Sequence, residues 1–150
     1  MTPIQTILVP MDFGAPSEAA LAYAVDLAEA LGARLYLLHT YQVPLVGFPM
    51  AAAPAVGDLA GQIAAEGQKA LEAAVSKVQG RKVEITPVLK QGDPREVILE
   101  MAKDVRANLI VMGTHGRRGI ARALIGSVTE SVVRTADVPV LTVHGVTEMA

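Results

Sequence analysis

Apolar residues along this chain fall into five short runs, separated by longer segments in which apolar positions recur at helical spacing. The short runs are rich in Val, Ile and Leu and predict strands at residues 6–10, 35–39, 83–89, 109–112 and 138–143. The first and fourth runs show no alternation of apolar and polar side chains. Such continuous runs are typical of parallel strands that are buried on both faces of a sheet.

Four segments between these runs are predicted to be helical. In the first, apolar positions recur three and four residues apart, and Gly32 marks the end of the helix. Asp58 is a suitable N-cap for the second, after a loop rich in Pro, Gly and Ala at residues 41–57. Asp93 and Pro94 form a cap followed by proline at the first helical position. The predicted helices are residues 16–31, residues 58–79, the segment from Asp93 to about residue 106, and the segment that follows Gly126.

This alternation of strands and helices predicts an α/β fold with a doubly wound, five-stranded parallel sheet and helices on both faces. We expect one domain over residues 1–150, with its core at about residues 4–145. In such sheets, ligands bind beyond the carboxyl ends of the strands, where the winding direction reverses. Asp12 follows the first strand and Gly113 follows the fourth. If these strands are neighbours, both residues face one crevice.

The composition excludes several classes of function. The chain has 150 residues, of which 51% are hydrophobic and 3% aromatic, and 13 basic against 15 acidic residues give a formal net charge of −2. Because the charges nearly balance and aromatic residues are few, we expect no nucleic-acid partner. The absence of cysteine excludes disulfides and thiol chemistry, and it is compatible with a reducing cytoplasm, where we expect the protein to reside. The uncharged stretch 35–57 is broken by prolines and glycine, so we expect no membrane span.

A glycine-rich stretch before the fourth helix carries the clearest sign of chemistry. Residues 113–127 read GTHGRRGIARALIGS, in which Gly113 and Gly116 are followed, after nine residues, by Gly126 and Ser127. Glycines let the backbone turn its N–H groups toward an anion. A helix start adds unpaired N–H donors and the positive end of a dipole. The pattern predicts a phosphate-binding loop.

Other interpretations of these residues stay open. Gly113 and Gly116 are also compatible with ordinary turns, and Arg117 either binds phosphate or belongs to a solvated cationic face. Ser127 and Glu130 form the S-x-x-E pattern of a capping box, which stabilises a helix start by itself. The chain has neither the G-K pair of a Walker A loop nor a G-x-G-x-x-G after the first strand.

With these motifs in this order, the chain resembles the universal stress protein family and, within it, the ATP-binding branch. The resemblance covers nearly the whole chain and departs at Gly14, where many relatives carry a serine. The matching segments are residues 7–13 (ILVPMDF), 37–40 (LLHT), 113–116 (GTHG), 126–128 (GSV) and 138–143 (VPVLTV).

The resemblance implies that an adenine nucleotide binds across the first and fourth strands. The ligand would be ATP, or AMP or ADP, with Mg²⁺ bridging the phosphates. Different residues would border the adenosine, line the path of the ribose and phosphates, and hold the phosphates. Pro10, Asp12 and Thr40 would border the adenosine. Met112, Gly113 and Gly116 would line the ribose and phosphate path, and Gly126, Ser127 and Val128 would hold the phosphates. The positive charge of Arg117 makes it a further candidate for phosphate binding. A plain turn role remains the alternative for Asp12.

The family also implies a nucleotide-responsive regulator or stress-tolerance factor that forms a homodimer through the edge strand at residues 138–143. An apolar edge strand is a liability that such pairing removes. One alternative is a slow Mg²⁺-dependent ATPase, but no general base is evident, so we favour a protein that is not an enzyme. The other alternative is a dimeric interaction module that binds no nucleotide.

Overall fold

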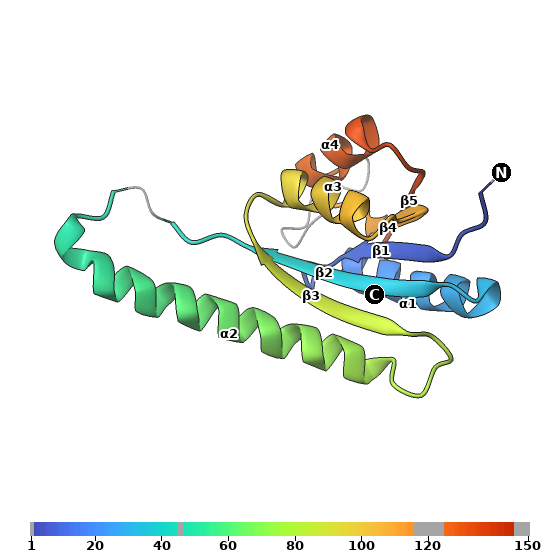
Figure 1. Ribbon diagram of the computed structural model, residues 1–150, viewed down its shortest axis with the longest axis horizontal. Coiled ribbons are helices and arrows are strands. Elements are labelled where there is room, and N and C mark those ends of the chain that lie inside the picture. Colours follow the sequence, from blue (N-terminus) through green and yellow to red (C-terminus); the bar gives the residue numbers. More distant parts are fainter. Residues whose placement is uncertain (1, 45–46, 116–124, 146–150) are drawn as a thin grey trace, which may run out of the picture.

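Five parallel strands form the centre of the computed structural model, which describes residues 2–44, 47–115 and 125–145 (Figure 1). The strand order across the sheet is β3-β2-β1-β4-β5, and every adjacent pair is parallel. The sequence therefore predicts the fold class correctly, and β1 and β4 are neighbours as the crevice requires. The strands are β1 (Thr6–Pro10), β2 (Arg34–Tyr41), β3 (Ile85–Gln91), β4 (Leu109–Gly113) and β5 (Val140–Val143).

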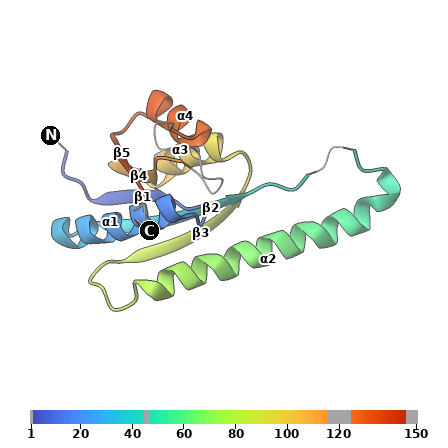
Figure 2. The ribbon, with the colours of Figure 1, turned by 180° about the vertical axis from the view of Figure 1, so that it is seen from behind.

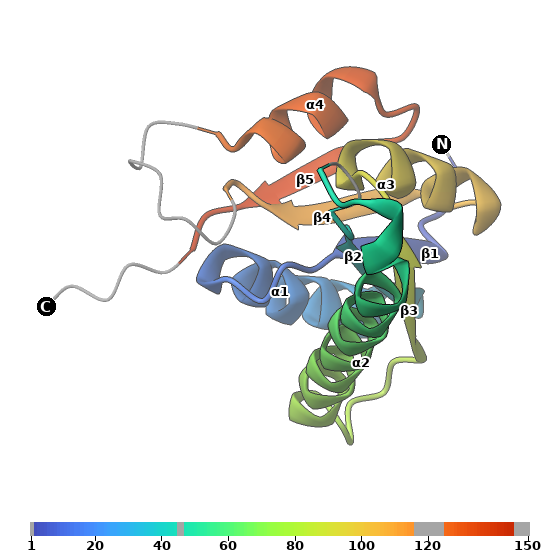
Figure 3. The ribbon, with the colours of Figure 1, turned by 90° about the vertical axis from the view of Figure 1, so that its left-hand side faces the viewer.

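Helices cover both faces of this sheet, as Figure 3 shows with α1 and α2 on one side and α3 and α4 on the other. Alternate side chains of β1 serve the two faces: Ile7 and Val9 pack toward α1 and α2, whereas Leu8 packs toward α3 and α4. All three are fully buried, which explains why the sequence of β1 shows no polar alternation. The helices are α1 (Ala15–Leu31), α2 (Ala53–Lys77), α3 (Pro94–Asp104) and α4 (Ser127–Thr135), and a short 3-10 turn, η1 (Met50–Ala52), precedes α2.

Two helix boundaries follow the local signals in the sequence. Gly32 ends α1 in the left-handed conformation, with φ 67°. At the start of α3, the Asp93 carboxylate accepts a hydrogen bond of 2.9 Å from the backbone N–H of Arg95, as expected of a cap. The bounds of the remaining elements differ from the expected ones by a few residues, except in α2.

The start of α2 was predicted wrongly. The helix begins at Ala53 rather than at Asp58, and Pro54 occupies its first turn, where a missing N–H costs nothing. The proline-rich segment that predicts a loop therefore contains the first turn of a helix. The first half of α2 also extends well beyond the sheet (Figures 1 and 2). The buried residues of this helix, Gly67, Leu71 and Ala74, all lie in its second half.

None of the helices among the described residues is both long enough and apolar enough to cross a bilayer.

Candidate functional site

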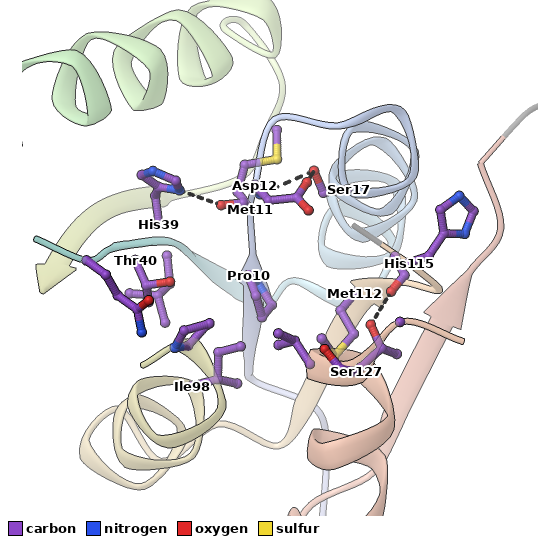
Figure 4. Close-up of a pocket in the computed structure, with 17 residues that line it drawn as sticks. Pro10, Met11, Asp12, Ser17, His39, Thr40, Ile98, Met112, His115 and Ser127 are labelled. Carbon is purple, nitrogen blue, oxygen red and sulfur yellow. Dashed lines mark hydrogen bonds between the residues drawn. The ribbon is translucent and has the colours of Figure 1, made fainter. Parts of the chain in front are cut away.

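A cavity of about 420 Å³ lies at the carboxyl ends of β1, β2 and β4 (Figure 4). This edge is the switch point of the sheet, because β1 has β2 on one side and β4 on the other, and the chain winds away in opposite directions. The volume is in the usual range for a pocket that takes a small ligand. Its lining residues are Pro10, Met11, Asp12, Ser17, Leu38, His39, Thr40, Gln42, Pro94, Ile98, Met112, Gly113, His115, Gly126, Ser127, Val128 and Thr129.

Eight of the ten predicted site residues line this cavity together. They come from the ends of β1, β2 and β4 and from the start of α4: Pro10, Asp12, Thr40, Met112, Gly113, Gly126, Ser127 and Val128. The other two, Gly116 and Arg117, lie outside the described residues. Asp12 and Gly113 share one crevice, as expected from neighbouring strands. Whether any of the ten residues binds a ligand stays a prediction.

Asp12 shapes the turn that leads from β1 into α1. Its Oδ1 atom accepts a hydrogen bond of 2.9 Å from the backbone N–H of Gly14 and one of 2.8 Å from the Ser17 hydroxyl. Between them, Phe13 adopts a φ of 65°, a left-handed conformation that a bulky residue rarely takes. The turn role of Asp12 is therefore real. It occupies Oδ1 and leaves Oδ2 without a partner among the described residues, so a role toward a ligand is compatible with it.

The start of α4 is fastened to the end of β4 beside the cavity. The Gly126 N–H donates a hydrogen bond of 2.8 Å to the Thr114 carbonyl oxygen, and the buried Thr129 hydroxyl donates one of 2.7 Å to the Gly113 carbonyl oxygen. Within the described parts of the chain, the backbone N–H groups of Ser127, Val128 and Thr129 have no hydrogen-bond partner. These three donors sit at the positive end of the helix dipole, which suits an anion.

The predicted capping box at the start of α4 is wrong. Gly126 is the N-cap, and no side chain caps the helix. A capping box requires Ser at the N-cap and Glu three residues later. Ser127 is instead the first helical residue, so it and Glu130 each lie one position too late to form the box.

Gly113 is required by packing. A Cβ atom on Gly113 would lie 2.7 Å from both the carbonyl carbon and the Cβ of Pro16, and 2.9 Å from the backbone nitrogen of Ser17. The first turn of α1 thus rests directly on the end of β4. The spacing of a phosphate motif does not by itself explain this glycine, and neither does the alternative of an ordinary turn.

The model of the universal stress protein family matches residues 3–144. The chain belongs to the universal stress protein family. It is 35% identical over 139 residues to universal stress protein MJ0531 of Methanocaldococcus jannaschii, an alignment that covers 91% of this chain and 80% of that protein.

Solved structures of family members share this fold. Universal stress protein UspA from Lactobacillus plantarum superimposes with a TM-score of 0.84 at 27% identity, covering 95% of this chain and 99% of that one. A universal stress protein in complex with cAMP superimposes with a TM-score of 0.67 at 28% identity, covering 97% of this chain and 100% of that one.

In this universal stress protein, several lining residues escaped the sequence interpretation. Pro94 and Ile98 of α3 and Gln42 beyond β2 form part of the cavity wall. The cap at Asp93 was a usable signal, because it places the start of α3 at the carboxyl edge of the sheet. The Arg95 side chain and the Arg95 backbone N–H both donate hydrogen bonds to Asp93 and hold the pKa of that carboxyl below its ordinary value.

His39, at the end of β2, makes both a hydrogen bond and a packing contact. Its Nδ1 atom lies 2.7 Å from the carbonyl oxygen of Met11 (Figure 4). Its ring also packs against the ring of Phe13, with 4.6 Å between the ring centroids.

Metal ligands are scarce at this site. No group of three or more His, Asp or Glu side chains suitable for a metal ion occurs in the described portion of the chain. Asp12 is the one carboxylate among the described lining residues. Asp12 is therefore the one carboxylate in this lining that could contribute to a Mg²⁺ site, which commonly takes one or two carboxylates.

Proposed function

We propose that this universal stress protein binds an adenine nucleotide in the switch-point cavity, with ATP as the preferred ligand and AMP or ADP as alternatives. The observation that carries the proposal is the start of α4, whose N–H groups have no partner among the described residues and border the cavity. A phosphate group satisfies these donors and the helix dipole at once. In this view the protein is a nucleotide-responsive regulator or stress-tolerance factor.

The adenosine end of the ligand would lie between β1, β2 and α3. Pro10, Leu38 and Ile98 offer apolar surface there, and the backbone of Thr40, at the end of β2, offers hydrogen bonds to the base. Asp12, which lines the cavity, would accept a hydrogen bond from a ribose hydroxyl through Oδ2. The complex of a relative with cAMP supports an adenine nucleotide as the ligand class.

The phosphate end of the ligand would lie at α4, where Ser127 and Val128 present backbone N–H groups. Mg²⁺ would bridge the phosphate oxygens, with Asp12 as the nearest carboxylate. Gly116 and Arg117 keep their predicted roles along the ribose and phosphate path. The lack of cysteine suits a cytoplasmic protein, which is where we place this one.

Ser127→Pro tests the proposal with little disturbance to the fold. Proline is favoured at the first position of a helix, and Gly126 has φ −63° and ψ 156°, the extended conformation that a residue before proline prefers. The substitution therefore removes one phosphate-facing N–H and keeps the helix. Ser127→Ala is the matched control, because it removes the hydroxyl and keeps the N–H.

Calorimetric titration with ATP, ADP and AMP, with and without Mg²⁺, gives the affinities. We expect wild type and Ser127→Ala to bind alike and Ser127→Pro to bind more weakly by about 1.5–3 kcal/mol, the value of a hydrogen bond to a charged group. In thermal unfolding, ligand at 100 times its dissociation constant adds about 2.7 kcal/mol of stability to a protein that binds it. No binding of any of these nucleotides by wild type would leave the interaction module as the surviving alternative, and release of inorganic phosphate from ATP would favour the slow ATPase.

We also propose that the protein is a homodimer that pairs through the edge strand at residues 138–143. The carbonyl oxygens of Pro139 and Val143 accept hydrogen bonds of 3.0 and 3.1 Å from the β4 side. In a parallel ladder alternate residues bond to the same neighbour, so Leu141 also faces β4, whereas Val140 and Thr142 direct their N–H groups outward. Thr142→Pro removes one outward N–H, and Thr142→Val keeps it. Sedimentation should give a dimer for wild type and Thr142→Val and a monomer for Thr142→Pro; a monomeric wild type would refute this assembly.

A further inference from the structure

His39 connects the turn after β1 to helix α2. Its Nδ1 atom is 2.7 Å from the Met11 carbonyl oxygen, and because a carbonyl only accepts, Nδ1 carries the proton and donates it. On the other side of this turn, the Asp12 Oδ1 atom holds the Ser17 hydroxyl at 2.8 Å. The left-handed Phe13 between these bonds is thus held from both sides, by β2 through His39 and by α1 through Ser17.

Helix α2 passes close to the imidazole ring at Gly67, which lies outside the cavity lining. A Cβ atom on Gly67 would lie 3.2 Å from Cδ2 of His39 and 3.0 Å from Cδ1 of Leu89. Gly67 is buried, and it does not line the cavity. Two other glycines of the same helix, Gly57 and Gly61, would meet nothing within 4 Å. Glycine inside a helix destabilises it relative to alanine. The close approach to His39 explains why glycine rather than alanine occupies position 67, and no such contact explains Gly57 or Gly61.

We propose that His39 is a positioning residue for the nucleotide site and that α2, through Gly67, sets its position. The His39 ring donates a hydrogen bond to the Met11 carbonyl oxygen, and this bond fixes the turn after β1. The turn in its fixed conformation orients the Asp12 carboxylate toward the cavity. A change in α2 that never touches the ligand therefore alters nucleotide affinity. This inference rests on the proposed nucleotide binding and adds to it a route by which the projecting helix communicates with the site.

Gly67→Ala tests the contact, with Gly61→Ala as the matched control on the same helix. Both substitutions improve helix propensity, but only the first places a methyl group against His39 and Leu89. In calorimetric titration with AMP and with ATP, we expect Gly67→Ala to bind about 2- to 30-fold more weakly than wild type, the usual size of coupling through packed side chains. Gly61→Ala should match wild type.

Substitutions of His39 itself separate positioning from packing. Asparagine places an N–H near the position of Nδ1, whereas leucine fills space without a donor. We expect His39→Leu to lose affinity and His39→Asn to recover much of it. In an Asp12→Asn background the effect of His39→Leu should shrink, because both changes act on the same carboxylate and are not additive. Nitrogen chemical shifts of the free wild-type protein should show His39 with its proton on Nδ1.

The outcomes distinguish the two proposals. If wild type binds nucleotide and Gly67→Ala binds as tightly as Gly61→Ala, the connection through α2 is wrong and the nucleotide site stands. Additive effects of His39→Leu and Asp12→Asn, or a His39 ring without a proton on Nδ1, would also overturn it. If wild type binds no nucleotide, both proposals fail together. Should Gly67→Ala not fold, the comparison of His39→Asn with His39→Leu decides the matter.

Discussion

Replacing Gly113 by alanine separates the two reasons for a glycine at the end of β4. A new Cβ would lie 2.7 Å from two carbon atoms of Pro16. Carbon atoms in contact are ordinarily about 3.5–4.0 Å apart, so α1 must retreat by about 1 Å or the strand end must bend. An extra methyl group in a well-packed core costs about 1–3 kcal/mol. We expect the upper end of that range, because the obstructing carbonyl carbon of Pro16 and nitrogen of Ser17 belong to the backbone and cannot rotate away.

Unfolding of the nucleotide-free protein measures this cost directly. A loss of about 3 kcal/mol lowers the Tm of a chain of this size by about 6–12 °C. Gly61→Ala is the control: its Cβ meets nothing within 4 Å, and we expect a gain of about 0.5–1 kcal/mol from helix propensity. The reasoning is refuted if Gly113→Ala melts within about 2 °C of wild type in the absence of ligand. If that variant also loses nucleotide binding, the glycine serves the close approach of a ligand instead of the seating of α1.

Three further predictions concern the elements around the site. Thr129→Val leaves the Gly113 carbonyl oxygen without its 2.7 Å hydrogen bond, so we expect a loss of about 1–3 kcal/mol in urea unfolding. Thr135→Val, which removes an equally short bond at the exposed end of α4, should stay within about 0.5 kcal/mol; equal losses would contradict the claim that burial matters. Leu71→Ala removes a fully buried side chain of α2 and should cost about 2–5 kcal/mol, whereas a smaller loss would show that α2 is loosely seated. The folded state lowers the pKa of Asp93, so its stabilisation is complete above the ordinary carboxyl pKa and disappears as pH falls through the lowered value. The Tm difference between wild type and Asp93→Ala should therefore shrink on acidification below about pH 4, and a difference independent of pH would contradict this.

Local patterns in the sequence were sufficient for much of the fold. The apolar run of β1 predicts a buried strand because every side chain of such a strand meets a protein face. Gly32 ends α1, and Asp93 caps α3, because these effects act over one turn of chain and depend on few neighbours. Asp12 and Gly113 were predicted to share one crevice for a similar reason, since parallel strands bring their carboxyl ends to a single edge, and both line the cavity.

The errors arose where a local signal had more than one solution. Pro54 is compatible with a loop and with the first turn of a helix, and α2 begins at Ala53 with Pro54 in that turn. Ser127 matches a capping pattern, but the hydrogen bond from Gly126 to Thr114 places the helix start one residue earlier. Composition and periodicity do not indicate at which of two sterically permitted residues a helix begins in the folded protein.

By itself, the sequence determined the strands, the α/β class and the edge of the sheet where a ligand would bind, because each depends on preferences that neighbouring residues express together. Only the tertiary structure decided the strand order, the seating of α1 on Gly113 and the contact of Gly67 with His39. These features join residues that are far apart in the chain. The free energy of these contacts comes from close packing between two residues, so it cannot be read from either residue alone before the fold brings them together.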